Sequence, residues 1–396
     1  MVLSRKALAI PPSMTLKIDA LSKEMRAKGM DVVSFGVGEP DFDTPNYIKK
    51  AAVEALQKGY TKYTAASGIA ELKQAICSRY EKKYGLSYAE NCCVVSNGAK
   101  HSLFNSFQAI LNPGDEVLII APYWLSYSEL VKMADGIPVI VDAAEENGFM
   151  PEMAALEAAV TGRTKAIIIN SPSNPTGAVY SRELLVEIAA FCEKHDLFII
   201  SDEIYDELVY GIEPCSIASI SDDAKARTIV INGMSKAFAM TGWRIGYTLC
   251  DPVIAKVMTS FQSNATSNPC SISQYASIAA FQGGEKEMEE MVRIFRSRRD
   301  LLCSLINDIP GMKCAVPDGA FYALISIKNF LGKSFNGQLI PDSLTFAEVL
   351  LKEKMVAVVP GTPFAAEGYI RLAYTCSEDT IKKGISRIAD FCSKLS

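Results

Sequence analysis

The chain has 396 residues, a hydrophobic fraction of 49%, a charged fraction of 21% and a net charge of −5. At about 100–200 residues per domain, this length predicts two or three domains with a substantial core. The acidic balance argues against a nucleic-acid surface, and no apolar run approaches the roughly 18 residues of a membrane span. The first apolar stretch is too short for a signal peptide, so the cytoplasm is the expected compartment.

Cysteine and histidine offer little material for metal or triad chemistry. The 11 cysteines include no C-x-x-C pair, whereas a zinc ribbon needs paired spacings. We interpret them as buried thiols that stay reduced in a cytosol. Only His101 and His195 are present, so no metal site is expected. The chemistry must therefore use lysine, tyrosine, carboxylates and a cofactor.

The predicted elements begin with an arm, a helix over about 18–29 and an apolar strand that ends at Gly36 and Gly38. Residues 45–84 have a helical pattern that is broken near residues 59 and 67. Four apolar runs then predict strands over 117–121, 166–170, 197–201 and 228–231, with a helix over 182–195 between two of them. Strands that are apolar throughout and alternate with helices indicate a parallel sheet covered on both faces.

The last third of the chain has a different pattern. A long charged helix is predicted over 285–307, and we interpret its charge run at 296–300 as a solvated face. Strands near Phe321 and Val356 and a final helix follow. We expect an N-terminal arm over 1–45, a large domain over 46–284 and a small α+β domain over 285–396, with the arm packed against the small domain.

Three consecutive strand ends carry side chains suited to chemistry. Asn174 follows the second of these apolar runs, Asp202 and Tyr205 follow the third, and Lys236 follows the fourth, TIVI. The carboxyl ends of parallel strands share one edge, where functional groups gather. Singly, Asn174 could start a turn, Asp202 could cap a helix and Lys236 could lie at the surface. The apolar segment after Lys236, which includes Trp243, instead predicts a desolvated, nucleophilic amine.

The motifs SPSNPTG, SDEIY and SKAFAMTGWRIGY resemble the signature of fold-type I pyridoxal 5′-phosphate (PLP) enzymes in the class I/II aminotransferase family. The resemblance runs from Gly38 to Arg371 and is nearest to the bacterial-type aspartate aminotransferases. It implies the PLP-dependent transferase fold type I, α/β, with a mostly parallel seven-stranded sheet and a smaller α+β domain. The implied activity moves an amino group between aspartate or glutamate and a 2-oxo acid such as 2-oxoglutarate, in a ping-pong reaction through pyridoxamine phosphate.

The resemblance also assigns the residues around the cofactor ring. Lys236 would hold PLP as a Schiff base and then serve as general base and acid. Asp202 would pair with the pyridine nitrogen and keep it protonated. Asn174 and Tyr205 would hydrogen-bond the ring oxygen, and Trp124 would stack on the ring.

Other residues would bind the cofactor phosphate at a helix start, where backbone N–H groups face an anion. By resemblance these are Gly98, Ala99, Lys100, Ser235, Arg244 and, from the neighbouring subunit, Tyr63. Sharing of this kind implies a homodimer with two joint active sites.

The substrate would be held by its α-carboxylate. Arg371 would bind that group with both arms of its guanidinium, which suits a carboxylate better than an ammonium does. Gly38, Trp124 and Asn174 would contact the same substrate.

The residues for a distal carboxylate stay open in the sequence. No arginine maps onto the one that some aspartate aminotransferases take from the neighbouring subunit, so Ser13, Thr15 and Lys17 in the arm are candidates. Alternative functions on the same fold are an aminotransferase for aromatic or prephenate-type substrates and a PLP-dependent β-lyase. A PLP-binding regulator would need a DNA-binding segment, and the roughly 45 residues before the large domain are not net basic.

Overall fold

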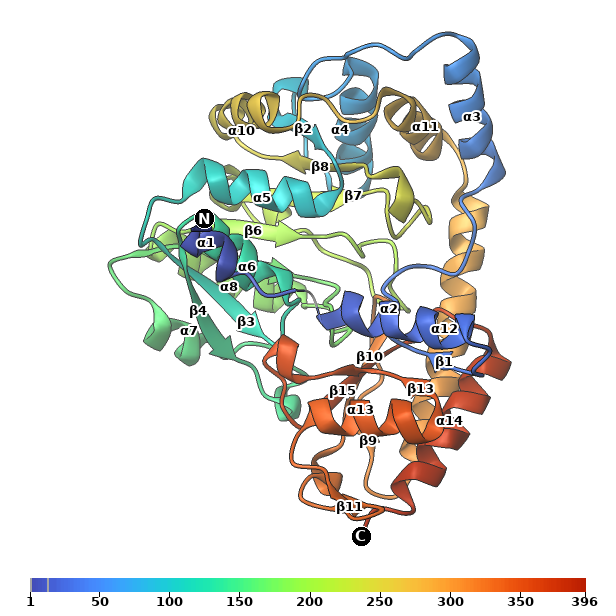
Figure 1. The fold of residues 1–396 in the computed structure, drawn as a ribbon. Helices are drawn as coiled ribbons and strands as arrows, with labels where there is room; N and C mark the ends of the chain where they lie inside the picture. The colour runs from blue at the N-terminus through green and yellow to red at the C-terminus, as the bar shows by residue number, and fades with distance from the viewer. Residues whose placement is uncertain (1, 13) are drawn as a thin grey trace.

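The computed structural model describes residues 2–12 and 14–396, apart from the side chains of residues 14–16 and 19. Its largest element is a seven-stranded sheet in the order β2-β8-β7-β6-β5-β3-β4, in which β8 alone runs antiparallel (Figure 1). The strands are β2 (Cys93–Ser96), β3 (Glu116–Ala121), β4 (Ile137–Asp142), β5 (Thr164–Asn170), β6 (Phe198–Asp202), β7 (Thr228–Gly233) and β8 (Gly246–Leu249). The predicted mostly parallel seven-stranded sheet is therefore confirmed.

Both faces of this sheet are buried, as its continuous apolar runs predict. Ile200 and Ile229 lie in one core with α5 (Ala99–Ile110), α6 (Ser126–Met133) and α10 (Pro252–Ala265). Ile199 and Val230 point to the opposite face, because successive strand residues alternate. That face is covered by α3 (Asn46–Gln57), α4 (Ala70–Tyr84), α7 (Met153–Ala159), α8 (Arg182–Lys194), α9 (Asp222–Arg227) and α11 (Ser271–Gln282).

A second, four-stranded antiparallel sheet lies in the lower part of Figure 1 and has the order β14-β15-β10-β9. Its strands are β9 (Lys313–Cys314), β10 (Tyr322–Ser326), β14 (Val359–Pro360) and β15 (Tyr369–Ala373), and the helices around it are α12 (Glu285–Asn307), α13 (Ser343–Lys354) and α14 (Glu378–Cys392). A short hairpin joins β11 (Ser334–Phe335) to β12 (Gln338–Leu339). The smaller α+β unit is thus confirmed, while the expected boundaries at 45/46 and 284/285 stay a prediction.

The beginning of the chain packs with this second unit. β1 (Val33–Ser34) pairs in parallel with β13 (Val356–Ala357), and α2 (Met14–Ala27) lies beside it. The short α1 (Arg5–Leu8) instead reaches the large sheet's side, where Lys6 Nζ lies 2.9 Å from an Asp135 carboxylate oxygen. Among the described residues, no helix has the length and apolar composition that crossing a membrane requires.

The charged helix α12 corrects one expectation. Its run at 296–300 is not simply a solvated face, because Arg298 pairs with Asp41 at 2.7 Å and Arg299 is buried. Arg299 donates to the carbonyl oxygen of Pro317 at 2.9 Å and lies over the Tyr210 ring. Arginine can bury its apolar stem and plane while its N–H groups stay bonded, so a charge run does not by itself mark an exposed face.

Candidate active site

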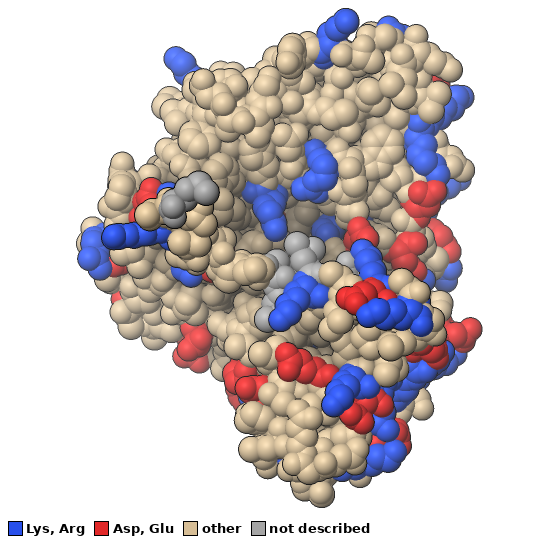
Figure 2. All heavy atoms as spheres, in the orientation of Figure 1, with Lys and Arg blue, Asp and Glu red and all other residues tan. Residues whose placement is uncertain are grey.

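The ends of β5, β6 and β7 meet at one cavity of about 480 Å³. Asn170 and Asp202 are direct neighbours in the β5–β6 register, and Lys236 follows β7 by three residues. Asn174, Tyr205 and Lys236 all line this cavity, so the predicted convergence of the three strand ends is present. The cavity lies between the two sheets, and Figure 2 shows basic side chains gathered around the hollow.

Lys236 reaches into the cavity from the segment after β7. Its Nζ donates to the carbonyl oxygen of Gly38 at 2.5 Å. Burial lowers the pKa of Lys236 to about 8, although Glu39 nearby favours the charged form. At pH 7 such an amine is neutral in about a tenth of molecules, against roughly one in 3,000 at an ordinary pKa of 10.5. The side chain is therefore a usable nucleophile near neutral pH.

Asp202 is buried at the end of β6. One carboxylate oxygen accepts from Tyr127 Oη at 2.7 Å, and the other accepts from the Ile204 amide at 3.2 Å. Burial raises the pKa of Asp202 to about 6, while both hydrogen bonds and Lys236 oppose that shift. A carboxylate this deeply placed needs a cationic or proton-donating partner, and the cavity is the open side on which a ligand can supply one.

Arg371, on β15, brings a buried cation to the same cavity. Its two Nη atoms donate to Asn174 Oδ1 and to the Gly36 carbonyl oxygen, each at 3.0 Å. The guanidinium lies 4.4 Å from the centre of the Tyr322 ring, and its Nε is buried without a hydrogen-bond partner. Within the described part of the chain, no carboxylate makes an ion pair with Arg371. A buried, uncompensated guanidinium with a free donor is a ready receptor for an anion.

The N-terminus of α5 forms another part of the cavity wall. Gly98 precedes this helix with φ +87°, and a Cβ there would lie 2.4 Å from Nη2 of Arg244. Glycine is therefore needed for the guanidinium to reach the helix start. Lys100 Nζ lies 4.8 Å from the centre of the Trp124 ring, and burial together with Arg244 lowers its pKa. Two cations and a helix N-terminus make this end a site for a dianion such as a phosphate ester.

The structure brings most of the predicted residues together and leaves a few outside. Those that line the cavity are Gly38, Ala99, Lys100, Trp124, Asn174, Asp202, Tyr205, Ser235, Lys236, Arg244 and Arg371. Gly98 adjoins it through Arg244, whereas Tyr63 is 91% exposed and does not line it within one chain. Lys17 is exposed on α2 and is not part of the lining; Ser13 and the Thr15 side chain lie outside the described residues.

Sequence reasoning missed several residues of the lining. Tyr127 lies one helical turn after Trp124, and Glu39 lies in the same GEPD segment as Gly38, so both stood beside residues already singled out. Lys23 of α2 and Tyr322 of β10 had no such signal. Tyr322 Oη lies 3.0 Å from Tyr205 Oη, and a Cβ on Gly38 would lie 2.8 Å from it.

The charges of the lining side chains indicate which ligands the cavity can hold. Its described lining contains five cationic side chains and two carboxylates. The fold and this site define an enzyme in which a nucleophilic lysine acts on a ligand that carries anionic groups at two ends, one at α5 and one at Arg371.

Comparisons with known proteins agree with this class. The model of the family "Aminotransferase class I and II" matches residues 30–388. An aspartate aminotransferase of Bacillus sp. (strain YM-2) is 46% identical over 98% of this chain and 99% of its own, and an aspartate/prephenate aminotransferase of Nitrosomonas europaea is 42% identical over 99% and 100%. The solved Thermus thermophilus aspartate aminotransferase with maleate superposes with a TM-score of 0.94, 42% identity and coverage of 99% and 100%. The chain belongs to the class I and II aminotransferase family and is an aminotransferase, as the motifs predict.

Proposed function

We propose that the protein is a PLP-dependent aspartate aminotransferase. The observation that carries this proposal is the placement of Lys236 and the uncompensated Arg371 in one cavity whose far end is a helix N-terminus with Arg244. The aspartate substrate is supported by the names of the relatives, several of which are aspartate aminotransferases. Aspartate would leave as oxaloacetate after giving up its amino group, and 2-oxoglutarate would receive that group and leave as glutamate.

The residues present fit PLP at both of its ends. The N–H groups at the start of α5, Ser235 and Arg244 would hold the phosphate. Asp202 would hold the ring nitrogen, which supplies the proton donor that this buried carboxylate needs. When bound, the cofactor supplies a carbonyl carbon that accepts the amino nitrogen and a ring that withdraws electrons from the substrate.

The remaining chemistry belongs to the protein. Arg371 binds the α-carboxylate through its fork, and Asn174, bonded to that fork, orients it. Lys236 would take the proton from the substrate Cα and deliver it to the cofactor carbon that has accepted the amino nitrogen. Its pKa near 8 lies in the range where a general base works at neutral pH. Tyr205, whose hydroxyl is hydrogen-bonded to that of Tyr322, would hydrogen-bond the oxygen on the cofactor ring.

The direct test is a panel of amino donors and acceptors. Aspartate and glutamate are expected to give the highest kcat/KM, since relatives of 43–46% identity are named aspartate aminotransferases. Prephenate is the second acceptor to include, because several relatives are named aspartate/prephenate aminotransferases. Release of ammonia and pyruvate without transfer would instead identify a β-lyase and contradict the proposal.

The lowered pKa of Lys236 predicts how cofactor loading depends on pH. The neutral amine reacts with the aldehyde, so loading of the apoenzyme should speed up about tenfold per pH unit below pH 8 and level off above it. Stopped-flow absorbance of the lysine-bound cofactor measures this rate. Free Nα-acetyl-lysine is the control, and its rate should keep rising to about pH 10. A rise that continues unbroken to pH 10 in the protein would mean that Lys236 titrates like the free amine.

We also propose a cytoplasmic homodimer. Tyr63 and the apolar side chains of Val53 and Leu56 are exposed on α3 and the segment after it, which a partner subunit would cover. Tyr63 would then reach the phosphate of the partner's site, as the resemblance implies. The 11 cysteines are all free, as is usual in a reducing compartment.

A further inference from the structure

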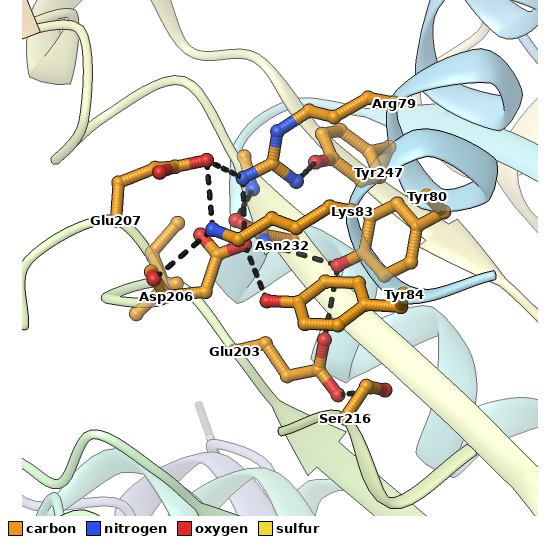
Figure 3. Close-up of polar contacts among 12 residues, drawn as sticks. Arg79, Tyr80, Lys83, Tyr84, Glu203, Asp206, Glu207, Ser216, Asn232 and Tyr247 are labelled. Atoms are coloured by element: carbon orange, nitrogen blue, oxygen red, sulfur yellow. Dashed lines mark hydrogen bonds and ion pairs between the residues drawn. The ribbon is translucent and has the colours of Figure 1, made fainter. Parts of the chain in front are cut away.

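A second buried polar cluster lies close to the ends of β6 and β7 (Figure 3), and none of its members lines the cavity. It joins α4 to the segment that follows β6 and to the neighbouring strands β7 and β8. We call it the α4 cluster; its members are Arg79, Tyr80, Lys83, Tyr84, Glu203, Asp206, Glu207, Ser216, Asn232 and Tyr247. A buried polar group lowers stability unless it keeps its hydrogen bonds, so a cluster of this size in a core suggests a role beyond packing.

One hydrogen-bonded path crosses this cluster from β6 to β7. Tyr80 Oη donates to Glu203 Oε2 at 3.1 Å and accepts from Asn232 Nδ2 at 3.0 Å. Asn232 Oδ1 in turn accepts from the amide of Gly233 at 2.7 Å. All three residues are buried, with at most 3% exposed for any of them. We call this path the Tyr80 bridge.

The Tyr80 bridge ends on the two segments that carry the residues the reaction needs at the ring. Glu203 directly follows Asp202, and Asn232 lies four residues before Lys236. Asp202 lines the cavity while Glu203 does not, because successive residues of an extended segment point to opposite sides. The backbone is fixed at the same point, since the Glu203 amide donates to the Ile231 carbonyl oxygen at 2.8 Å. The bridge therefore clamps the two strand ends from the side away from the ligand.

The rest of the α4 cluster anchors the same segment one residue after Tyr205. Asp206 accepts from Arg79 Nη2 at 2.6 Å, from Lys83 Nζ at 3.2 Å and from Tyr84 Oη at 3.1 Å. Burial alone would raise the pKa of Asp206, but the Arg79 and Lys83 cations hold it well below its ordinary value. Asp206 therefore stays ionised, and its bonds to α4 hold in place the helix that carries Tyr80.

We propose that Glu203, Tyr80 and Asn232 are positioning residues that set the placement of Asp202 relative to Lys236. This inference rests on the proposed PLP-dependent function. A bridge of buried hydrogen bonds resists displacement, since each broken bond leaves a polar group without a partner in a low dielectric. Residues of this outer layer orient the groups that touch a ligand and tune how tightly it is held.

The test is Tyr80→Phe, which removes one hydroxyl and keeps the ring in its core. It should raise the dissociation constant of the apoenzyme for PLP by about tenfold, the lower end of what outer-layer partners contribute at metal sites. The pH midpoint of the visible absorbance of the bound cofactor should also move, because the Lys236 amine and Asp202 no longer keep their spacing. In turnover, kcat should fall while KM for aspartate stays near the unmutated value, since Arg371 is untouched.

Tyr84→Phe is the matched control, the same change one helical turn later in the same cluster. Tyr84 bonds Asp206 and is not part of the Tyr80 bridge. It should lower the melting temperature of the apoenzyme much as Tyr80→Phe does, but leave the PLP dissociation constant and the absorbance midpoint unchanged. Equal behaviour of the two variants, with a lower melting temperature and nothing else, would overturn the positioning role.

Two further measurements keep the outcomes separate. If Tyr80→Phe does not fold, Asn232→Ala cuts the same bridge at its β7 end and carries the same expectations. With PLP, the unmutated protein must show the absorbance band of the lysine-bound cofactor, and Lys236→Ala must lose that band. If it does not, the proposed function fails; if it does and the bridge variants bind PLP normally, only the positioning role fails.

Discussion

Lys236→Ala is expected to remove the absorbance band of the lysine-bound cofactor and to lower turnover by at least about 10⁴-fold. The variant loses both the amine that bonds the cofactor and the base that moves the substrate proton, and positioned general bases alone contribute about 10² to 10⁴. Absorbance spectra and steady-state kinetics with aspartate and 2-oxoglutarate measure the two losses. The phosphate site at α5 is unchanged in this variant, so PLP should still bind, more weakly.

The same prediction has a sharper form, because three described lysines line the cavity. Borohydride reduction of the loaded protein fixes the cofactor to the lysine that holds it, and peptide mass spectrometry identifies that residue. Lys236 is the expected site, as it is the one that reaches inward to the Gly38 carbonyl, whereas Lys100 and Lys23 are exposed at the rim. Label on either rim lysine, or full activity of Lys236→Ala, would be incompatible with the proposed role.

Arg371→Ala is expected to lower kcat/KM by about 10²- to 10³-fold for every amino acid, mainly through KM. The α-carboxylate is common to all of them, and loss of a buried, bidentate charge pair typically costs about 3–4 kcal/mol. The loss should therefore be similar for aspartate and glutamate. Binding of maleate, a dicarboxylate without an amino group, should weaken in parallel.

Arg371→Lys is the companion variant, because it keeps the charge and removes the fork. An intermediate loss is expected, since an ammonium cannot bond Asn174, Gly36 and a carboxylate in the same geometry. Melting temperatures of both variants show whether the Gly36 and Asn174 contacts have been lost with the fold. An unchanged KM in a folded Arg371→Ala protein would remove Arg371 from substrate binding.

The sequence predicts those parts of the site that follow from local pattern. The runs that became β5, β6 and β7 are apolar throughout, and the polar residues just after them can meet only at the shared edge of a parallel sheet. Asn174, Asp202 and Lys236 could therefore be singled out before any coordinates. The resemblance extended the same reasoning to Arg371 and to the start of α5.

The parts that could not be predicted depend on contacts between distant segments. Tyr322 comes to Gly38 and Tyr205 from the second sheet, and Tyr80 comes to Glu203 from α4, with no local pattern that pairs them. The buried Arg299 was misjudged for the same reason: its neighbours in sequence are charged, while its partners Tyr210 and Pro317 lie elsewhere in the chain. The hydrophobic pattern of a sequence indicates the periodicity of a single helix or strand. It does not indicate which distant segments will contact each other in the folded core.

The pairing of β1 with β13 has a consequence for how the protein is made. A strand near the beginning of the chain finds its partner only near the end, and Gly36, two residues after β1, accepts from Arg371. During synthesis from the N-terminus, the large sheet has all its strands once β8 has left the ribosome, but β1 must wait for β13, which lies near the end of the chain. We infer that the large sheet forms first and that the substrate site is completed last, when the two ends of the polypeptide close over it.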